Sequence, residues 1–344
     1  MKTGKNLWLY CLMGLAAVAL AGAASAAAGS VHIPFSSVLG IAVSRLPFFD
    51  APGTPEDWNT ILWEIRFPRI VLAGLVGAAL AVAGATYQGL FRNSLADPYL
   101  LGVASGAGLG ATIVLTTGAP IYLYGFSLVP LASFAGSLLA VSAAYITAGR
   151  RAGPPSRTSL ILAGVVVGSL ASALTSLLLM RSEPDLRPVL AWLLGGFTGA
   201  HWDYVTLTLP YLIPGMLALL AYGRTLNVLQ LNEDEAQQLG IDVRKTRLIL
   251  VGLASLVTAV AVSVSGLIGF VGLIAPHAVR LLWGQDYRLV LPLSMLAGAA
   301  FLIVADLAAR TMLGAIELPV GMVTAFCGAP FFLYLLRRVG RDAQ

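Results

Sequence analysis

The stretch RFPRIVLAGLVGAALAVAGATYQGLFRNSLADPYLLGVASGAGLGA, residues 66–111, decides the fold of this chain. Its first apolar run, Ile70 to Leu90, contains no charged residue, and a second uncharged run extends from Leu100 to Thr117. A helix of about 20 apolar residues is long enough to cross the hydrocarbon core of a bilayer. The stretch therefore predicts two membrane helices joined by the short polar turn RNSLADP.

The composition extends this interpretation to the whole chain. Of the 344 residues, 58% are hydrophobic and 11% are charged, whereas soluble domains average about 45–50% and about 25%. This surplus of apolar side chains excludes a water-soluble globule and is enough for about ten spans. The sequence thus predicts an all-α polytopic membrane protein with about ten transmembrane helices, in one transmembrane domain over residues 1–344.

The spans can be placed from the apolar runs. The runs are Leu7–Gly29, Ile70–Leu90, Leu100–Thr117, Phe126–Ala148, Leu160–Met180, Tyr204–Tyr222, Leu248–Ser265, Leu267–Trp283, Leu289–Ala309 and Leu318–Leu336. The first run could be a cleaved signal peptide, because Ala24-Ser25-Ala26 resembles a cleavage site. We favour an uncleaved span, because the run is longer than the 7–15 apolar residues of a signal peptide.

Two segments do not fit the pattern of spans. Residues 225–247 hold too many charges for hydrocarbon and form the longest polar insertion. Within it, Asn232 is a good helix cap, acids fill the next turn, and Gly240 ends the pattern. This predicts a short helix that docks onto a partner, with a merely solvated loop as the alternative. Residues 188–197 are too short to span and predict a re-entrant or surface helix on the periplasmic side.

Basic residues indicate the orientation. With the N-terminus inside, 15 of the 21 lysines and arginines fall on one side of the membrane. Because cytoplasmic loops carry the excess of positive charge, we expect both termini and the 225–247 loop in the cytoplasm, for a multi-pass protein of the cell inner membrane. The basic residues are scattered between apolar segments, so the partner is membrane lipid and no nucleic acid is expected.

Several classes of site are excluded by what the sequence lacks. There is no G-x-x-x-x-G-K-[ST] loop and no H-E-x-x-H pair, so we expect neither ATP hydrolysis in this chain nor a zinc site. No paired nucleophile and base lies within the spans, so a membrane-embedded hydrolase is excluded and no catalytic residue is assigned. An ion-gradient-driven secondary transporter is the alternative function, but it would need acids or histidines inside the spans. Asp306 and Glu317 instead predict a salt-bridge cluster with Arg310 near the outer surface.

Small and hydroxyl residues on the fifth run admit two interpretations. Gly164, Gly168, Ser172 and Ser176 recur every four residues, a pattern typical of tight helix contacts. Ser172, Thr175 and Ser176 could line a translocation pathway, or could bond the carbonyls of their own helix.

The residues quoted at the outset, with WLLGGFTGAHW at Trp192, the AQQLG segment at Ala236, GLIGFVGLIAPHAVRLLWGQDYR at Gly266 and ELPVGMVTAFCGAPFFLYLL near the C-terminus, resemble the FecCD-type permeases of ABC importers. The resemblance implies a type II ABC importer permease fold and a homodimer. It also implies two cytoplasmic ATPase subunits that hold ATP and Mg, and a periplasmic or lipid-anchored substrate-binding protein. The cargo would be a metal chelate, namely a ferric siderophore, cobalamin or haem. No cofactor or metal would sit in this chain.

The resemblance also assigns roles to individual residues. Outer arginines that dock the binding protein match Arg66, Arg69 and Arg310, and the alternative for these is intrachain pairing with Glu64, Asp306 or Glu317. Residues of the ATPase-coupling helix match Asn232, Glu233, Glu235, Ala236, Leu239 and Gly240. The inner gate matches Asn93 and Leu95, with Ser94 where the family has proline, and a second gate segment matches Thr158.

Overall fold

The computed structural model describes residues 7–29, 31–44, 55–117, 122–123, 126–149, 156–181, 186–314 and 316–342. The termini, whose cytoplasmic placement the sequence predicts, lie outside the described residues. The elements are α1 (Leu7–Ala27), α2 (Phe35–Val43), α3 (Glu56–Thr60), the π-helix η1 (Ile61–Arg66), α4 (Phe67–Phe91), the 3₁₀ helix η2 (Pro98–Leu101), α5 (Val103–Thr116), β1 (Tyr122–Leu123), β2 (Phe126–Ser127), α6 (Leu128–Ala148), α7 (Arg157–Arg181), α8 (Arg187–Leu194), α9 (Trp202–Ala221), α10 (Gly223–Val228), α11 (Glu233–Gln238), α12 (Val243–Ser265), α13 (Val271–Trp283), α14 (Tyr287–Thr311) and α15 (Val320–Asp342).

The all-α membrane architecture is confirmed. Among the described residues, seven helices are long and apolar enough to cross a membrane, and α5, α13 and the Val320–Leu333 part of α15 are three shorter apolar helices. Each of the ten apolar runs coincides with one of these helices. The strands β1 and β2 form only a short antiparallel pair.

The two segments that do not fit the span pattern also form helices. Residues 188–197 contain α8, as expected, ended by Gly195 at φ +69°. The 225–247 segment holds α10 and α11, but its last residues already belong to α12, which begins at Val243. The loop between helices is therefore shorter than the charged segment, because Arg244, Lys245 and Arg247 occupy the first turns of a long helix.

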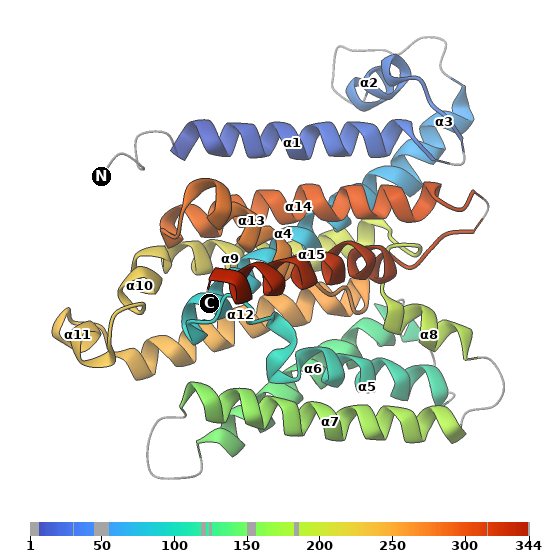
Figure 1. Cartoon of the computed structure of the whole chain (residues 1–344). Coiled ribbons are helices and arrows are strands. Elements are labelled where there is room, and N and C mark those ends of the chain that lie inside the picture. Colours follow the sequence, from blue (N-terminus) through green and yellow to red (C-terminus); the bar gives the residue numbers. More distant parts are fainter. Residues whose placement is uncertain are drawn as a thin grey trace.

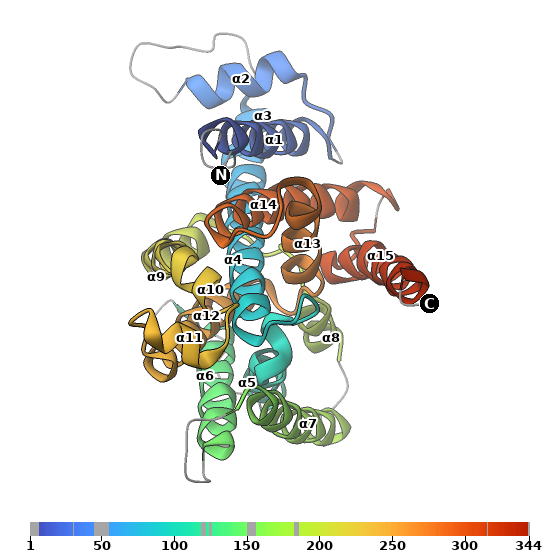
Figure 2. The same ribbon diagram turned by 60° about the vertical axis from the view of Figure 1, so that its left-hand side comes forward.

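The helices form one bundle around α4. Figure 2 shows α4 running through the middle of the bundle, with α13 and α14 on one side and α9 on the other. Every residue from Val76 to Phe91 is buried. In Figure 1 the bundle has two ends, one carrying α11 and the other carrying α2 and α8. We refer to them as the α11 end and the α2 end.

Glycines set the distance between α4 and its neighbours. A Cβ built on Gly84 would lie 2.1 Å from the carbonyl oxygen of Gly272 in α13, and one on Gly77 would lie 2.3 Å from that of Gly298 in α14. The small residues predicted to make tight contacts follow the same rule, since a Cβ on Gly164 of α7 would lie 2.2 Å from the carbonyl oxygen of Leu100 in η2. A Cβ on Gly106 of α5 would likewise lie 2.3 Å from the oxygen of Gly136 in α6. These helices thus touch backbone to backbone, the close approach that small residues allow in membranes.

We expect Gly84→Ala to destabilise the bundle, because the added methyl group meets backbone that cannot rotate away. Overpacking typically costs about 1–3 kcal/mol, and the apparent melting temperature in detergent should fall accordingly. Gly252→Ala in α12 is the matched control, because nothing lies within 4 Å of the position. Equal melting temperatures for the two variants would contradict this account of the packing.

Candidate functional site

The short helix α11 is built as the sequence predicts. The side chain of Asn232 accepts a hydrogen bond from the backbone of residue 235, and the carboxylate of Glu235 accepts one from the backbone N–H of Asn232 at 3.2 Å, which together form a capping box. Gly240 then reverses the chain at φ +82°. Within residues 232–240 only Ala236 is buried, and Leu239 is 62% exposed. The helix therefore presents nearly its whole surface outward.

Glu233, the first residue of α11, is held by arginines of other elements. Its Oε1 accepts a hydrogen bond at 2.7 Å from Nη2 of Arg247 in α12 and lies 3.9 Å from Nη2 of Arg157, the first residue of α7. The hydrogen bond from Arg247 lowers the pKa of Glu233, and the charges of Arg157 and Arg92 lower it further. The Glu233 carboxylate thus links α11 to the beginning of α7. It also interacts electrostatically with Arg92, the residue that ends α4.

Both predicted gate segments lie beside these arginines. Arg92 ends α4 in the left-handed conformation, at φ 50°, and its Nε donates to the carbonyl oxygen of Leu229 at 2.8 Å. Asn93 follows, and its side-chain oxygen accepts from the N–H of Leu95 at 2.9 Å, which fixes the turn. Thr158 is exposed next to Arg157. The structure therefore brings the loop after α4 and the start of α7 to the same end of the bundle as α11, while their roles as gates stay a prediction.

The hydroxyls predicted for a pathway lie on α7, and two of them bond their own helix. Thr175 donates to the carbonyl oxygen of Ala171 at 2.9 Å, and Ser176 donates to that of Ser172 at 3.0 Å. Ser172 and Ser176 are exposed, whereas Thr175 is buried. The alternative of hydrogen bonding within the helix therefore holds for Thr175 and Ser176, and it leaves both serines on an outward face.

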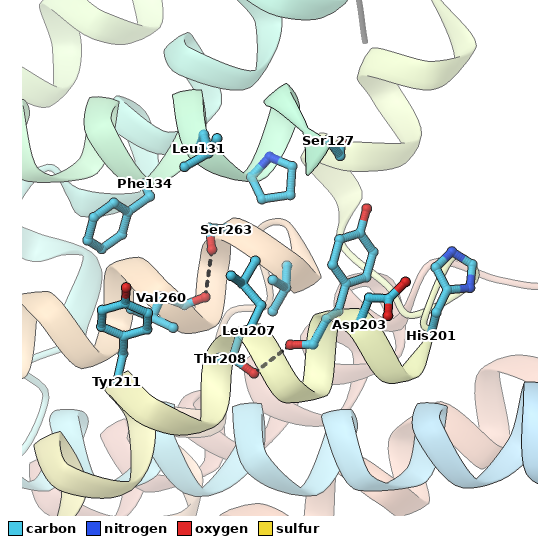
Figure 3. Close-up of a pocket in the computed structure, with 13 residues that line it drawn as sticks. Ser127, Leu131, Phe134, His201, Asp203, Leu207, Thr208, Tyr211, Val260 and Ser263 are labelled. Carbon is cyan, nitrogen blue, oxygen red and sulfur yellow. Dashed lines mark hydrogen bonds between the residues drawn. The ribbon is translucent and has the colours of Figure 1, made fainter. Parts of the chain in front are cut away.

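A groove near the α2 end is separate from these residues. It lies between α6, α9 and α12 and has a volume of about 330 Å³. Figure 3 shows His201 and Asp203 near one end and Phe134 and Tyr211 near the other. Thr208 and Ser263 donate to carbonyls of their own helices. None of the residues predicted for the pathway lines this groove.

The three outer arginines are buried and paired within the chain. Arg69 donates from Nε to both carboxylate oxygens of Asp306, at 2.9 and 3.1 Å, and from Nη1 to Glu317 at 3.0 Å. Arg310 donates to Asp306 at 3.2 Å and to the hydroxyl of Ser25 at 2.6 Å. The predicted salt-bridge cluster is confirmed, and it includes Arg69 as well as Arg310.

Arg66 has a different set of partners. Its guanidinium donates to the backbone carbonyls of Ala26, in the last turn of α1, and of Val31, in the connection to α2. A Cβ on Gly29 would collide with the same guanidinium. Arg66 therefore ties the α1–α2 connection to the start of α4, a contact that the sequence alone did not indicate because backbone acceptors leave no residue pattern.

No group of three or more His, Cys, Asp or Glu side chains that could hold a metal occurs among the residues that the structure describes. The features that stand out are instead the outward α11, the charged link at Glu233 and the arginine cluster at the α2 end. The first two lie at the α11 end, whereas the arginine cluster bonds α1, α4 and α14 together.

Comparison with known proteins places this arrangement in a family. The model of the FecCD transport family matches residues 15–338. This chain belongs to the FecCD transport family. A FecCD relative from Halobacterium salinarum, named cobalamin import system permease protein BtuC, is 48% identical over 83% of this chain and 75% of its own length. A Bacillus subtilis relative, named ABC transporter permease protein YvrB and uncharacterised, is 41% identical over 98% and 96%.

Two further comparisons agree with this membership. The vitamin B12 import system permease protein BtuC of Escherichia coli is 42% identical over 84% of this chain and 88% of its own. A solved structure described as an inward-facing conformation of a metal-chelate type ABC transporter matches with a TM-score of 0.83 at 28% identity, covering 95% of this chain and 98% of that one. The FecCD fold of this chain is thus shown by sequence and by structure.

We expect Asp306→Asn to destabilise this FecCD protein strongly. Asp306 is 1% exposed and neutralises Arg69 and Arg310, which are also buried, and removing one partner of a buried ion pair typically costs about 3–5 kcal/mol. Glu317→Gln is the graded control, because its side chain is 43% exposed and exposed pairs are typically worth about 0–1 kcal/mol. Thermal unfolding in detergent measures both, and a larger loss for Glu317→Gln would contradict the assignment.

Proposed function

We propose that this chain is the permease subunit of an ATP-driven ABC importer that moves a metal chelate across the inner membrane. The observation that carries the proposal is α11. It is capped at its N-terminus, stopped by a glycine and exposed on nearly every residue, so its form is not explained by packing within the chain. A short exposed helix with a leucine at its tip suits a cleft on an ATPase subunit.

The partners follow from the same arrangement. Two copies of this chain would enclose one pathway, and each copy would present α11 to one ATPase subunit, which binds ATP and Mg. The excess of basic residues favours the α11 end in the cytoplasm. The α2 end would then meet a periplasmic or lipid-anchored binding protein. The relatives named as import permeases of ABC systems support this assembly.

The role of Arg66, Arg69 and Arg310 at that outer face stays a proposal. Their guanidinium groups already form hydrogen bonds and ion pairs with Asp306, Glu317, Ser25 and backbone carbonyls. A charge reversal would therefore disturb folding as well as docking. Loss of binding-protein affinity counts as evidence for docking only in a variant whose melting temperature is unchanged. Full affinity at low salt in a folded Arg66→Gln variant would remove Arg66 from the docking surface.

Coupling would pass through Glu233. When the ATPase subunits close on ATP, a shift of α11 would move the Glu233 carboxylate and pull on Arg157 at the start of α7. The same shift would change the electrostatic interaction of Glu233 with Arg92, which precedes Asn93. Both gate segments would therefore respond to one displaced carboxylate. Alternating access needs such a link between the site of ATP hydrolysis and the pathway.

The cargo class rests on the relatives. Two of them are named for cobalamin or vitamin B12 import, and a structural neighbour is described as metal-chelate type. Cobalamin is therefore the first chelate to test, followed by ferric siderophores and haem. A pathway lined by small and hydroxyl residues would release such a cargo readily, since tight sites slow conduction.

The architecture is tested by co-purification. A tag on this chain, in mild detergent and from its native host, should recover an ATPase subunit at one copy per permease, and mass spectrometry measures the ratio. Recovery of the folded chain alone, reproducibly, would contradict the importer and favour an ion-gradient-driven transporter.

Replacing Glu233 by glutamine should uncouple transport from ATP hydrolysis. The substitution removes the charge that holds Arg157 and Arg247 and keeps the shape of the side chain. We expect cargo uptake per ATP to fall on the order of tenfold, the usual size of coupling between sites, while the ATPase remains bound. Cobalamin uptake and phosphate release in proteoliposomes measure the ratio.

Asp234→Asn is the matched control for this prediction. It removes one carboxylate from the neighbouring exposed position of the same helix. Equal uptake per ATP in the Glu233 and Asp234 variants would rule out a special role for Glu233.

A further inference from the structure

A second polar cavity, distinct from the groove of Figure 3, opens at the α11 end. Its volume is about 540 Å³, and it lies among the end of α4, the loop after it, the α10 segment and the α13–α14 connection. We call it the α4–α13 cavity. Its walls carry two arginines, Arg92 and Arg280, and one carboxylate, Asp286, together with amide and hydroxyl side chains.

Arg280 is the unusual member of this cavity. Its Nη2 donates to the side-chain oxygen of Gln88 at 2.5 Å, and its guanidinium carbon lies 5.9 Å from the ring centre of Tyr287. Its Nη1 is shielded from solvent and has no hydrogen-bond partner among the described residues. Within that part of the chain no carboxylate pairs with Arg280. The Tyr287 side chain also interacts with the guanidinium. Arg280 is therefore a partly buried cation on the cavity wall, and no carboxylate among the described residues balances its charge.

The one carboxylate on the cavity wall is engaged by other side chains, and donors of the loop after α4 remain available. Asp286 accepts from Arg288 at 2.5 Å and from Asn227 at 2.7 Å, and the Arg288 bond lowers its pKa to about 2. Its charge is thus balanced by Arg288, which does not line the cavity. Asn93 uses only its oxygen in the turn, which leaves its NH₂ group, and Ser94 adds an exposed hydroxyl.

We propose that the α4–α13 cavity binds a phosphate-type oxyanion, held between Arg280 and Arg92 and capped by the Asn93–Ser94 turn. Phosphate oxygens are strong acceptors that match two guanidinium groups and neighbouring N–H and O–H donors. The anion would join α13 to the loop after α4, the predicted inner gate, and its occupancy would hold that loop against the bundle. The phosphate could be free or could belong to the headgroup of an anionic lipid.

Binding itself does not depend on the proposed transport function, although the cytoplasmic source of the phosphate rests on the orientation proposed above. The test therefore uses the purified full chain in neutral detergent, without ATPase or binding protein. Inorganic phosphate is titrated by calorimetry at constant ionic strength, with chloride as the balancing anion. In a second arm, native mass spectrometry measures retention of phosphatidylglycerol against phosphatidylcholine.

We expect saturable binding in at least one arm, weakened about tenfold or more by Arg280→Gln, because a hydrogen bond to a charged group is worth about 1.5–3 kcal/mol. Ser94→Asp gives a second variant on an exposed turn, in case Arg280→Gln fails to fold, and it should weaken binding because it adds a negative charge to the wall. Arg224→Gln is the control: it also removes an arginine at this end, but an exposed one that does not line the cavity.

The two arms distinguish the source of the phosphate. Phosphate binding in lipid-free detergent identifies a soluble ligand, whereas selective retention of phosphatidylglycerol identifies a lipid headgroup. No binding in either arm, or the same affinity in wild type, Arg280→Gln and Ser94→Asp, overturns the proposal. Either result leaves the co-purification test of the importer unaffected.

Discussion

The close contact of α4 with its neighbours is the constraint on which the rest of the structure depends. Lipid is as apolar as the helix surfaces, so helices gain little from the hydrophobic effect when they associate, and the packing must come from fit and from polar bonds. Gly77 and Gly84 let α14 and α13 reach the α4 backbone. Tyr87 then bonds Ser255 of α12 at 2.6 Å, and Gln88 donates to the carbonyl of Gly272 at 3.0 Å. These contacts hold α12, α13 and α14 against α4. Gln88 also accepts from Arg280 of α13 and lines the α4–α13 cavity.

The sequence predicts well those features whose cause is local. Each apolar run became a helix because length and lack of charge alone suit a segment to hydrocarbon, and α11 formed because Asn232, Glu235 and Gly240 are local start and stop signals. Helix boundaries were less well predicted where side chains from other helices bond a backbone segment that is not helical. The eighth run starts at Leu267, but α13 begins at Val271 after Phe270 at φ 69°. The irregular backbone before it is satisfied by Tyr99, whose hydroxyl donates to the carbonyl of Ile268 at 2.9 Å and accepts from its N–H at 3.1 Å, as such backbone requires inside a membrane protein.

Charge pairs were predictable only where both members stand near each other in the chain. Asp306, Arg310 and Glu317 are close in sequence, and their cluster was expected. Arg69 joins the cluster from 237 positions away, and its pairing with Asp306 or Glu317 was named only as the alternative to docking. Arg157 reaches Glu233 from the start of α7. Neither contact leaves a local pattern in the sequence. The roles carried over by resemblance agree with this geometry to different degrees. The coupling helix has the exposure that a docking element needs, whereas the outer arginines are already occupied within the chain.

The two ends of the bundle differ in how their charges are balanced, and this difference suits an importer driven from one side. At the α2 end, Asp306 is enclosed by Arg69 and Arg310, and these bonds reach α1, α4 and α14 together. Moving any of these helices would expose an unpaired buried charge, so the cluster resists displacement. At the α11 end, Glu233 is half exposed and is shared among arginines, and Arg280 has a nitrogen without a partner. Rearranging these groups costs less, because water, a partner subunit or an anion can replace the lost contact. In the proposed orientation, the rigid end would receive the cargo, and the adjustable end would contact the ATPase subunits.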